Sequence, residues 1–565
     1  MAFSPEVYYI TVTDTTTKRS FAEPLKTKQH SRSSSSSSSS TTTKPLLIIT
    51  PSSSESTHSP STSPTSHMPV RDSTYTENDR VAIIRENMEK ATINGLSNGS
   101  SNGERKAPLT RKESSPMMPP FMVSAPGKVI VFGEHAVVHG KPAIAAAISL
   151  RSYLLVTSLS KSKRTISLRF PDINLSHTWN IDDLPWSTFS HPSKKKHYYD
   201  EVTSLDPELV AAMKPHLENI SPDESPAIRK IHQSSASSFL YIFLSLGSQS
   251  FPGCLYTLRS TIPIGAGLGS SASISVCLSS ALLLQIRTLS GPHPDQPSNE
   301  ASLQLERINR WAFVGEMCIH GNPSGVDNTV STQGKAVIYQ KSPDGPTVKP
   351  LRNFPELPLL LVDTQQAKST AHEVAKVDLL KQKHPAIVDS ILNAIDMVGQ
   401  SAAVMISDPE YDSEDLKCVE DLGKLMTVNH GLLVSLGVSH PRLERIRELV
   451  DHEGIGWTKL TGAGGGGCSI TLLKPGTTHD RMTRLEETLE TEGYKKFETT
   501  LGCDGVGVLW PAVIKNGEDD DFGGDEIDQE KFLNADGIEG VEELVGVHGQ
   551  SGDREAWKFW RVEDD

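Results

Sequence analysis

Apolar residues form short runs from about residue 121 onward, and several of these runs have the length and composition of buried strands. They include VIVF at 129–132, SYLLVTS at 152–158, CLYTLRS at 254–260, LPLLLVD at 357–363 and CSITLL at 468–473. Such β-branched and aromatic residues are favoured on the pleated surface of a sheet. We therefore expect these segments to be strands.

Other segments carry apolar residues at helical spacing. The clearest are 299–320, 386–407 and 480–492. Strands and helices follow one another in runs rather than in strict alternation, and this pattern favours an α+β fold. A Pro- and Gly-containing loop divides the pattern, so we expect one domain over 121–350 and a second over 351–515.

The two ends of the chain lack these patterns. Residues 1–120 are dominated by Ser, Thr, Pro and Asn, which predicts a disordered leader, and Met88 within it offers an alternative translation start. From 517 to 565 there are seventeen acidic and four basic residues, nearly the whole of the formal net charge of −14. We expect 516–565 to be a mostly disordered, dispensable acidic tail, and nothing here indicates a nucleic-acid-binding surface.

The cysteines and the hydropathy restrict the setting in which the protein works. The six cysteines form no CxxC pair and no zinc-binding pattern. The sequence carries no signal-peptide pattern and no apolar stretch long enough to cross a bilayer. We expect reduced thiols, a cytoplasmic location and no membrane partner.

The segment IPIGAGLGSSASIS at 262–275 predicts a phosphate-binding cradle. Its alternate glycines let backbone N–H groups approach an anion, and an apolar helix that begins at the serines adds unpaired donors. No lysine precedes the serines as in the usual P-loop, so a cation must come from elsewhere. The alternative is a glycine-rich loop before a buried helix. The candidate nucleotide-binding residues of the cradle are Pro263, Gly265, Ala266, Gly267, Leu268, Gly269, Ser270 and Ser271.

The segment SAPGKVIVFGEHAVVHG at 124–140 supplies candidate cations. Lys128 precedes the strand at 129–132, and Glu134 and His135 follow it. A Lys and a His that face a cleft can offset the charge of an anionic substrate or of a transferring phosphoryl group. Taken alone, each also fits a plain role, Lys128 as a surface lysine and His135 as a structural histidine.

Two carboxylates occur in GEMCIHGNPSGVDN at 315–328. Glu316 lies toward the end of the predicted helix, and Asp327 lies in or just after the loop. Carboxylates near a phosphate cradle suit two tasks, holding Mg²⁺ and accepting a hydroxyl proton. The alternatives are an exposed helix carboxylate for Glu316 and a helix N-cap for Asp327.

A second glycine-rich segment is KLTGAGGGGCS at 459–469, with Gly464 and Gly465 near its centre. So many glycines are costly in conformational entropy unless something must approach the backbone closely. The segment therefore predicts a second wall for a phosphate or a substrate. The alternative is a flexible hairpin turn.

Together these segments resemble the superfamily of galactokinases, homoserine kinases, mevalonate kinases and phosphomevalonate kinases (GHMP kinases), over roughly 121–513. The three superfamily signatures match PGKVIVFGEHAVVHG, PIGAGLGSSAS and KLTGAGGGGCS in the right order, and HGNPSGVDN resembles the mevalonate kinases most narrowly. The resemblance implies an N-terminal half like ribosomal protein S5 domain 2 and a ferredoxin-like C-terminal half. It also implies phosphoryl transfer from ATP to the 5-hydroxyl of (R)-mevalonate, a step of isoprenoid and sterol synthesis.

The resemblance assigns roles by motif position. Asp327 matches the catalytic base and Lys128 the lysine that pairs with it. Ser271 and Glu316 match the Mg²⁺ ligands, with Ser270 as the alternative serine. The implied substrate-side residues are Glu134, His135, Lys368, Thr370, Gly464 and Gly465.

One departure from the family is visible, and two further properties are implied. The family often carries Pro-Arg-Ser/Asn-Thr where this chain has Ala367-Lys368-Ser369-Thr370, and Lys lacks the planar, bidentate grip of Arg. The resemblance also implies a homodimer and feedback inhibition by isoprenoid diphosphates.

Three other functions compete with this one. The first is a sibling enzyme, a phosphomevalonate or homoserine kinase. The second is a sensor that binds ATP and a small acid or sugar without turnover, although retention of Asp327, Lys128, Glu316 and Ser271 argues against it. The third is an acidic, Ser-rich interaction protein with a vestigial kinase body.

Overall fold

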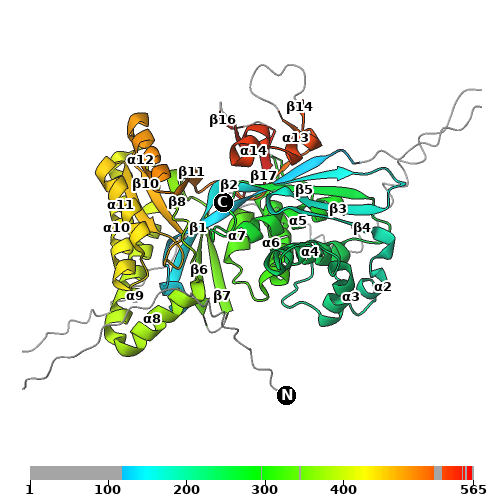
Figure 1. The fold of residues 1–565 in the computed structure, drawn as a ribbon, viewed down its shortest axis with the longest axis horizontal. Helices are drawn as coiled ribbons and strands as arrows, with labels where there is room; N and C mark the ends of the chain where they lie inside the picture. Colours follow the sequence, from blue (N-terminus) through cyan, green and yellow to red (C-terminus); the bar gives the residue numbers. More distant parts are fainter. Residues whose placement is uncertain are drawn as a thin grey trace, which may run out of the picture. The chain divides into compact units, whose positions relative to one another are not determined.

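The computed structural model describes residues 118–293, 295–342, 345–514, 525–549, 552–553 and 556–562. Nearly all of the predicted leader (1–120) lies outside these ranges, and so do parts of the predicted acidic tail. The compact unit that contains the described residues is shown in Figure 1.

One sheet runs through the described body. Its longest path is β17-β12-β1-β2-β11-β8-β10-β9, with β3 to β7 branching from β2 (Figure 1). Each pairing is antiparallel except that of β3 with β5. Its strands are β1 (Phe121–Phe132), β2 (Pro142–Ser158), β3 (Thr165–Phe170), β4 (Leu175–Asn180), β5 (Cys254–Ser260), β6 (Ala336–Ser342), β7 (Gly345–Leu351), β8 (Leu357–Asp363), β9 (Gly456–Leu460), β10 (Cys468–Leu473), β11 (Lys495–Leu501), β12 (Gly507–Leu509) and β17 (Lys558–Phe559).

The helices fall into three groups along the chain. The described helices are α2 (Trp186–Phe189), α3 (Pro207–Leu217), α4 (Pro226–Leu246), α5 (Ser270–Gln285), α6 (Ser298–His320) and α7 (Val326–Gln333), then α8 (Thr370–Lys383), α9 (Pro385–Ile406), α10 (Leu416–Ser435), α11 (Pro441–Glu453) and α12 (His479–Thr491), and finally α13 (Gln529–Leu533) and α14 (Gly537–Val545). Strands and helices in such runs confirm the α+β prediction. The strands expected from the five apolar runs are all present.

Strand β2 connects the two halves of the body. Its C-terminal part pairs with β5, its N-terminal part with β6, and Ile148 between them pairs with Leu501 of β11. It also pairs with β1 along nearly its whole length. Arg151 is buried in this strand, where its guanidinium donates to Ser124 Oγ and to the Asp504 carbonyl. The buried charge therefore does not interrupt the strand, because its donors have partners.

Each half has its own apolar core. In the N-terminal half, α4, α5 and α6 pack together, and α5 also contacts β1 and β2; Phe239, Leu283 and Trp311 are buried there. In the C-terminal half, α10, α11 and α12 pack against β9, β10 and β11, and α9 packs against α10 and β2 (Figure 1). Leu361 and Ile470 contribute to the second core. The predicted boundary at 350 falls between the two helix groups and stays a prediction.

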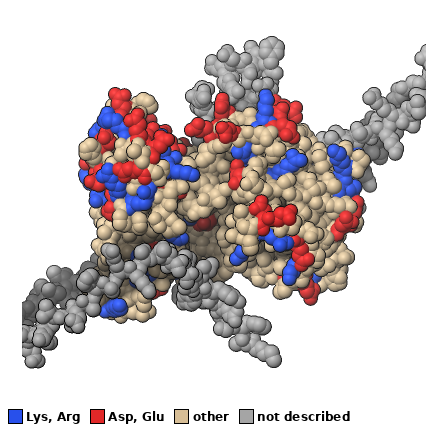
Figure 2. All heavy atoms as spheres, viewed as in Figure 1, with Lys and Arg blue, Asp and Glu red and all other residues tan. Residues whose placement is uncertain are grey.

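The expectation of a mostly disordered tail at 516–565 is wrong for its described residues. β17 pairs with β12, and the tail helices α13 and α14 cover one face of β1 and β2. The charges of the tail concealed a set of apolar residues at buried positions, and burial of those residues offsets the entropy of ordering the segment. They are Ile527, Phe532, Val541, Val545, Trp557 and Trp560. Acidic side chains remain on the outside of these helices in Figure 2.

The state of the cysteines and the length and hydropathy of the helices can be compared directly with the expectations from the sequence. All six cysteines lie in the described ranges, and each is a free thiol. None of the helices in the described ranges is both long enough and apolar enough to span a membrane.

Candidate active site

The predicted cradle has the backbone that its glycines indicated. Gly265, Gly267 and Gly269 take φ values of 77°, 80° and 76°, in the left-handed region that favours glycine. Gly269 is the N-cap of α5, which begins at Ser270. The turns therefore end at the N-terminus of a buried helix, where unpaired N–H groups and the helix dipole favour an anion.

Lys128 supplies the cation that the cradle sequence lacks. Its backbone N–H donates to the Leu268 carbonyl (2.8 Å), and its Nζ donates to the Gly267 carbonyl (3.3 Å). The same Nζ lies 3.3 Å from Oδ1 of Asp327, in the first turn of α7. A Cβ at position 269 would lie 2.9 Å from Lys128 Cγ, so Gly269 also gives the lysine room. The structure thus joins two predicted site residues with the cradle.

Glu316 and Ser271 meet on the other side of the N-terminus of α5. The Ser271 hydroxyl donates to Glu316 Oε2 (3.3 Å), and the Ser275 hydroxyl donates to Oε1 (3.4 Å). Burial, with a further effect of the Asp327 charge, raises the pKa of Glu316 to about 7. This geometry favours Ser271 over Ser270 as the partner of Glu316. A buried carboxylate that is costly to ionise gains from a nearby cation.

A cavity of about 530 Å³ opens onto these residues. Ser271, Asp327 and the cradle glycines line it, together with apolar side chains such as Ile231 and Leu258. A pocket that combines apolar walls with phosphate-binding groups suits a nucleotide.

Sequence reasoning missed several residues of this cavity. Asp172, Ile173, Lys230 and Ser234 line it, and His320 lies 3.0 Å from Ser271 Oγ through its Nε2. The lining residues come from the polar region before α4 and from α4 itself. Polar composition made that region look like a surface insertion, and the sequence carried no motif that pointed to its return to the cradle.

Lys368 lies between the two glycine-rich segments. A Cβ at Gly467 would come within 2.2 Å of its Nζ, and one at Gly267 within 4.0 Å. Burial lowers the pKa of this lysine, and the Lys128 charge lowers it further. Lys368 also lines a second cavity of about 980 Å³ on the outer side of the cradle, together with Pro263 and Gly265. The structure therefore places Lys368 next to the cradle.

The other residues predicted on the substrate side, Glu134, His135 and Thr370, have environments that differ from that of Lys368 and from one another. Glu134 is fully buried in an ion pair with Lys459 and accepts from Asn429 Nδ2 (3.0 Å), so its carboxylate joins β9 and α10 to the turn after β1. His135 bonds through Nε2 to the Ala463 carbonyl (2.9 Å). Thr370 is exposed at the first position of α8.

Gly464 and Gly465 pack against protein rather than toward the cradle. A Cβ at Gly464 would lie 2.0 Å from the Val438 carbonyl oxygen, and one at Gly465 would lie 2.6 Å from Glu373 Oε1. Gly465 N–H donates to the same Val438 carbonyl (2.7 Å). The close approach that these glycines predicted is therefore an approach of α8 and of the loop after α10.

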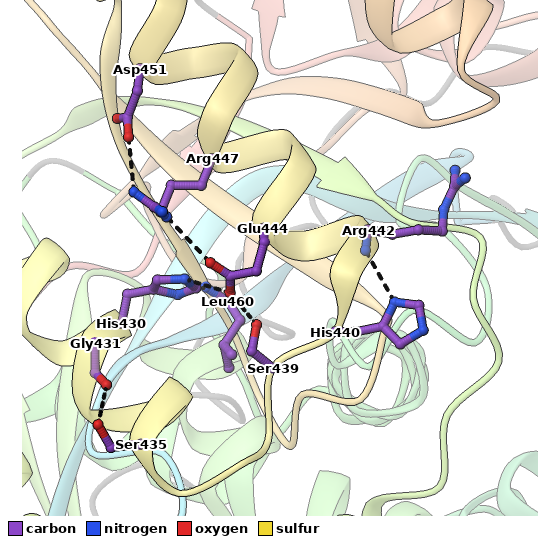
Figure 3. A network of polar contacts seen from close by, with 10 residues as sticks. All are labelled: His430, Gly431, Ser435, Ser439, His440, Arg442, Glu444, Arg447, Asp451 and Leu460. Carbon is purple, nitrogen blue, oxygen red and sulfur yellow. Dashed lines mark hydrogen bonds and ion pairs between the residues drawn. The ribbon is translucent and has the colours of Figure 1, made fainter.

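A polar network holds β9 where it enters the second glycine segment (Figure 3). His430 Nδ1 accepts from the Leu460 N–H (3.2 Å), so the ring carries its proton on Nε2, which lies 3.1 Å from Glu444 Oε1. Glu444 in turn pairs with Arg447, and Arg447 with Asp451. Burial lowers the pKa of His430, which favours this neutral form. The network fixes the end of β9 against α10 and α11.

The raised pKa of Glu316 gives a stability prediction for the metal-free protein. Between its ordinary pKa of 4.5 and about 7, the native protein binds more protons at this site than the unfolded chain, so the free energy of unfolding falls as the pH rises. Glu316→Gln removes this loss. We expect the variant to be more stable than the wild type by roughly 3 kcal/mol at pH 8, and no more stable below pH 4.5.

Urea unfolding at pH 4 and pH 8, in the presence of a chelator, measures the difference in the free energy of unfolding between the variant and the wild type. Glu448→Gln, on the exposed side of α11, is the matched control and should show no such pH dependence. Equal free energies of unfolding for Glu316→Gln and wild type at pH 8 would mean that ionisation of Glu316 does not destabilise the native protein.

Comparisons with known proteins agree with this geometry. The family model for the "GHMP kinases N terminal domain" matches residues 236–335, and that for "GHMP kinases C terminal" matches 413–492. A mevalonate kinase of Gibberella zeae is 72% identical over 465 residues, 82% of this chain and 92% of the relative. One of Aspergillus fumigatus is 64% identical over 87% of this chain and 91% of the relative.

A solved structure of the Methanococcus jannaschii mevalonate kinase is 26% identical, covers 67% of this chain and 97% of its own, and has a TM-score of 0.46. The two fungal relatives span most of this chain, including the cradle, Lys128, Glu316 and Asp327. At such identity and coverage, the chain belongs to the mevalonate kinase family of the GHMP kinases.

Proposed function

We propose that this chain transfers the γ-phosphoryl group of ATP to the 5-hydroxyl of (R)-mevalonate, and that it does so in the cytoplasm. The observation that carries the proposal is the ion pair of Lys128 and Asp327 beside the cradle. Asp327 lines one cavity with Ser271, whose hydroxyl bonds to Glu316. Phosphoryl transfer needs mainly positioning and compensation of charge, and this group of residues can provide both.

The residues divide the reaction between them. Backbone N–H groups of the cradle and the N-terminus of α5 bind the phosphates of ATP. Asp327 accepts the proton as the mevalonate oxygen bonds to the γ-phosphorus, and the bond from that phosphorus to the bridging oxygen of ADP breaks. Lys128, which is only 10% exposed, offsets the negative charge that spreads over the transferring group.

The residues present also fit a magnesium ion. Glu316 carries a buried carboxylate that is costly to ionise without a cation, and the Ser271 hydroxyl is its neighbour. Mg²⁺ commonly takes only one or two protein ligands and completes its shell with water and phosphate oxygens, so this pair of groups is sufficient. Glu316 and Ser271 would hold Mg²⁺, which would neutralise phosphate charge.

Glu316→Gln is accordingly expected to raise the Mg²⁺ concentration for half-maximal turnover about tenfold, because a neutral amide binds a hard cation more weakly than a carboxylate does. A titration of Mg²⁺ at fixed ATP measures this. A titration curve that superimposes on that of the wild type would remove Glu316 from the metal site.

Lys368 is proposed to bind an anionic group of one of the substrates, since it lies between the cradle and Gly467. His135 and Thr370 are proposed to shape the mevalonate end, and Glu134 to hold the turn that carries His135. Gly464 and Gly465 are proposed to give that end its backbone shape. The homodimer and the feedback inhibition by isoprenoid diphosphates remain predictions.

A panel of acceptors tests the proposal against its alternatives. Purified protein is incubated with ATP, Mg²⁺ and one of mevalonate, phosphomevalonate or homoserine, and ADP is measured by a coupled assay. We expect ADP production only with mevalonate. A preference for another acceptor would indicate a sibling enzyme, and nucleotide binding without turnover a sensor. Slow hydrolysis that no acceptor stimulates would favour a vestigial kinase body.

A further inference from the structure

The C-terminal extension, residues 525–549, lies outside both family-model matches and packs against the strands that lead to the cradle. Gln529, at the start of α13, donates to Thr257 Oγ1 of β5 (2.7 Å) and accepts from Thr157 Oγ1 of β2 (2.7 Å). Strand β5 ends at Ser260 and continues directly into the cradle at 262–269. The extension is therefore anchored to the element that precedes the phosphate-binding loop.

Arg259, next to the end of β5, is the central contact of this anchor. Its side chain is 6% exposed, and its Nη1 donates to three carbonyls at the C-terminal end of α13. These carbonyls belong to Phe532 (3.1 Å), Leu533 (3.1 Å) and Ala535 (2.9 Å). The last carbonyls of a helix lack hydrogen-bond donors within the helix and carry partial negative charge. A buried guanidinium at this position supplies the donors and a compensating positive charge.

The other edge of the same guanidinium reaches the nucleotide cavity. Arg259 Nε donates to Asp172 Oδ1 (2.8 Å), and the second oxygen of that carboxylate accepts from the Ser260 N–H (2.7 Å). Asp172 lines the cavity that holds Asp327 and the cradle glycines. Arg259 thus joins α13 to Asp172, and Asp172 in turn lines the cavity and bonds to Ser260, the last residue of β5.

The extension also faces the cradle across the second cavity. Asp536, Ile538 and Glu539, at the start of α14, line this cavity together with Ile264 and Gly265 of the cradle. The same segment therefore has two relations to the cradle, a bonded link through Arg259 and Asp172 and a shared cavity wall.

We propose that the C-terminal extension holds the cradle in its nucleotide-binding conformation, with Arg259 as the positioning residue. The extension is then a part of the ATP-binding half of the enzyme and not a dispensable tail. The proposal rests on the proposed function for its kinetic readout, while nucleotide binding tests it independently of any acceptor.

The test compares four variants with the wild type by the Kd of a non-hydrolysable ATP analogue with Mg²⁺, and by kcat and the KM of each substrate. Arg259→Met should raise the Kd and the KM for ATP about tenfold, the size expected for a lost buried, charge-assisted contact. The KM for mevalonate and the kcat at saturating ATP should stay close to wild type. Arg259→Lys can bond either Asp172 or the carbonyls but not both sets, and it should give an intermediate Kd.

Arg164→Met is the matched control, since it removes an arginine that pairs with Asp182 in the same half of the body without touching Asp172, α13 or the cradle. It should lower the melting temperature and leave the Kd for the analogue unchanged. Asp172→Asn keeps Arg259 and its bonds to α13, so it serves if Arg259→Met does not fold, and it should raise the Kd severalfold.

Two results would overturn the proposal. One is an unchanged Kd in Arg259→Met, or in Asp172→Asn if the first variant does not fold. The other is an equal rise in Arg259→Met and Arg164→Met, which would reflect general loosening of the body. Failure of the proposed function would look different, because wild-type protein would then bind the analogue and produce no mevalonate-dependent ADP.

Discussion

Asp327→Asn is expected to lower kcat about a thousandfold while the KM for ATP changes little. Transfer of a proton to a positioned carboxylate contributes between about a hundredfold and ten-thousandfold to a rate, and a neutral amide cannot accept the proton. Asp327 is the carboxylate within ion-pair distance of Lys128, and it faces the cavity with its side chain 36% exposed. The coupled ADP assay with saturating mevalonate and ATP measures the loss.

The stability of the same variant supplies an independent check on the geometry. The Asp327 charge contributes to the raised pKa of Glu316, so its removal should lower that pKa, and the pH-dependent loss of stability at Glu316 should become smaller and end at a lower pH. Asp389→Asn, on the exposed side of α9, is the matched control and should change neither quantity. Near-normal turnover of a folded Asp327→Asn protein would exclude this residue as the base.

Lys128→Met is expected to lower kcat about a hundredfold or more. The lysine is the nearest cation to Asp327, and in a site that excludes water such a charge stabilises the transferring phosphoryl group far more than it would in solution. It also donates to the Gly267 carbonyl, so a smaller rise in the KM for ATP should accompany the loss. Steady-state kinetics with each substrate varied in turn separate the two effects.

Lys128→Arg should recover little of this activity, because a planar guanidinium is larger than the ammonium and cannot place its charge at the same point, 3.3 Å from Oδ1 of Asp327. Lys381→Met, which breaks an ion pair with Asp389 on the surface of the C-terminal half, is the matched control. If Lys128→Met turned over at the wild-type rate, compensation of the phosphoryl charge would have to come from another residue, with Lys368 the first candidate.

The sequence was most informative where a short segment determines its own geometry. The alternate glycines from 265 to 269 take the backbone angles that they indicated, and α5 begins at the serines that follow. The motif resemblance then linked four such segments that lie far apart in the chain. The contact of Lys128 with Asp327, and that of Ser271 with Glu316, followed from this resemblance and not from composition or periodicity.

Long-range partners were the part that could not be predicted. Asp172 lies in a polar region with no motif. It reaches the cavity because β3 pairs with β5, and this pairing brings the turn that follows β3 next to Ser260. Glu134 was expected at the substrate end, yet Lys459 and Asn429 bury its carboxylate. Net charge misled in the tail, since a few well-spaced apolar side chains outweigh many charges that stay in water.

The edge that β17 adds to the sheet has a consequence for synthesis in the cell. β17 pairs with β12, and the other neighbour of β12 is β1, the first strand of the described body. A growing polypeptide makes β1 early, but β12, which covers the edge of β1, emerges only after nearly the whole kinase body, and β17, which covers the edge of β12, emerges later still. Until then an unpaired strand border stays open to other chains. Premature stop codons shortly before 558 should therefore yield insoluble product, and purification tags are better placed away from this end.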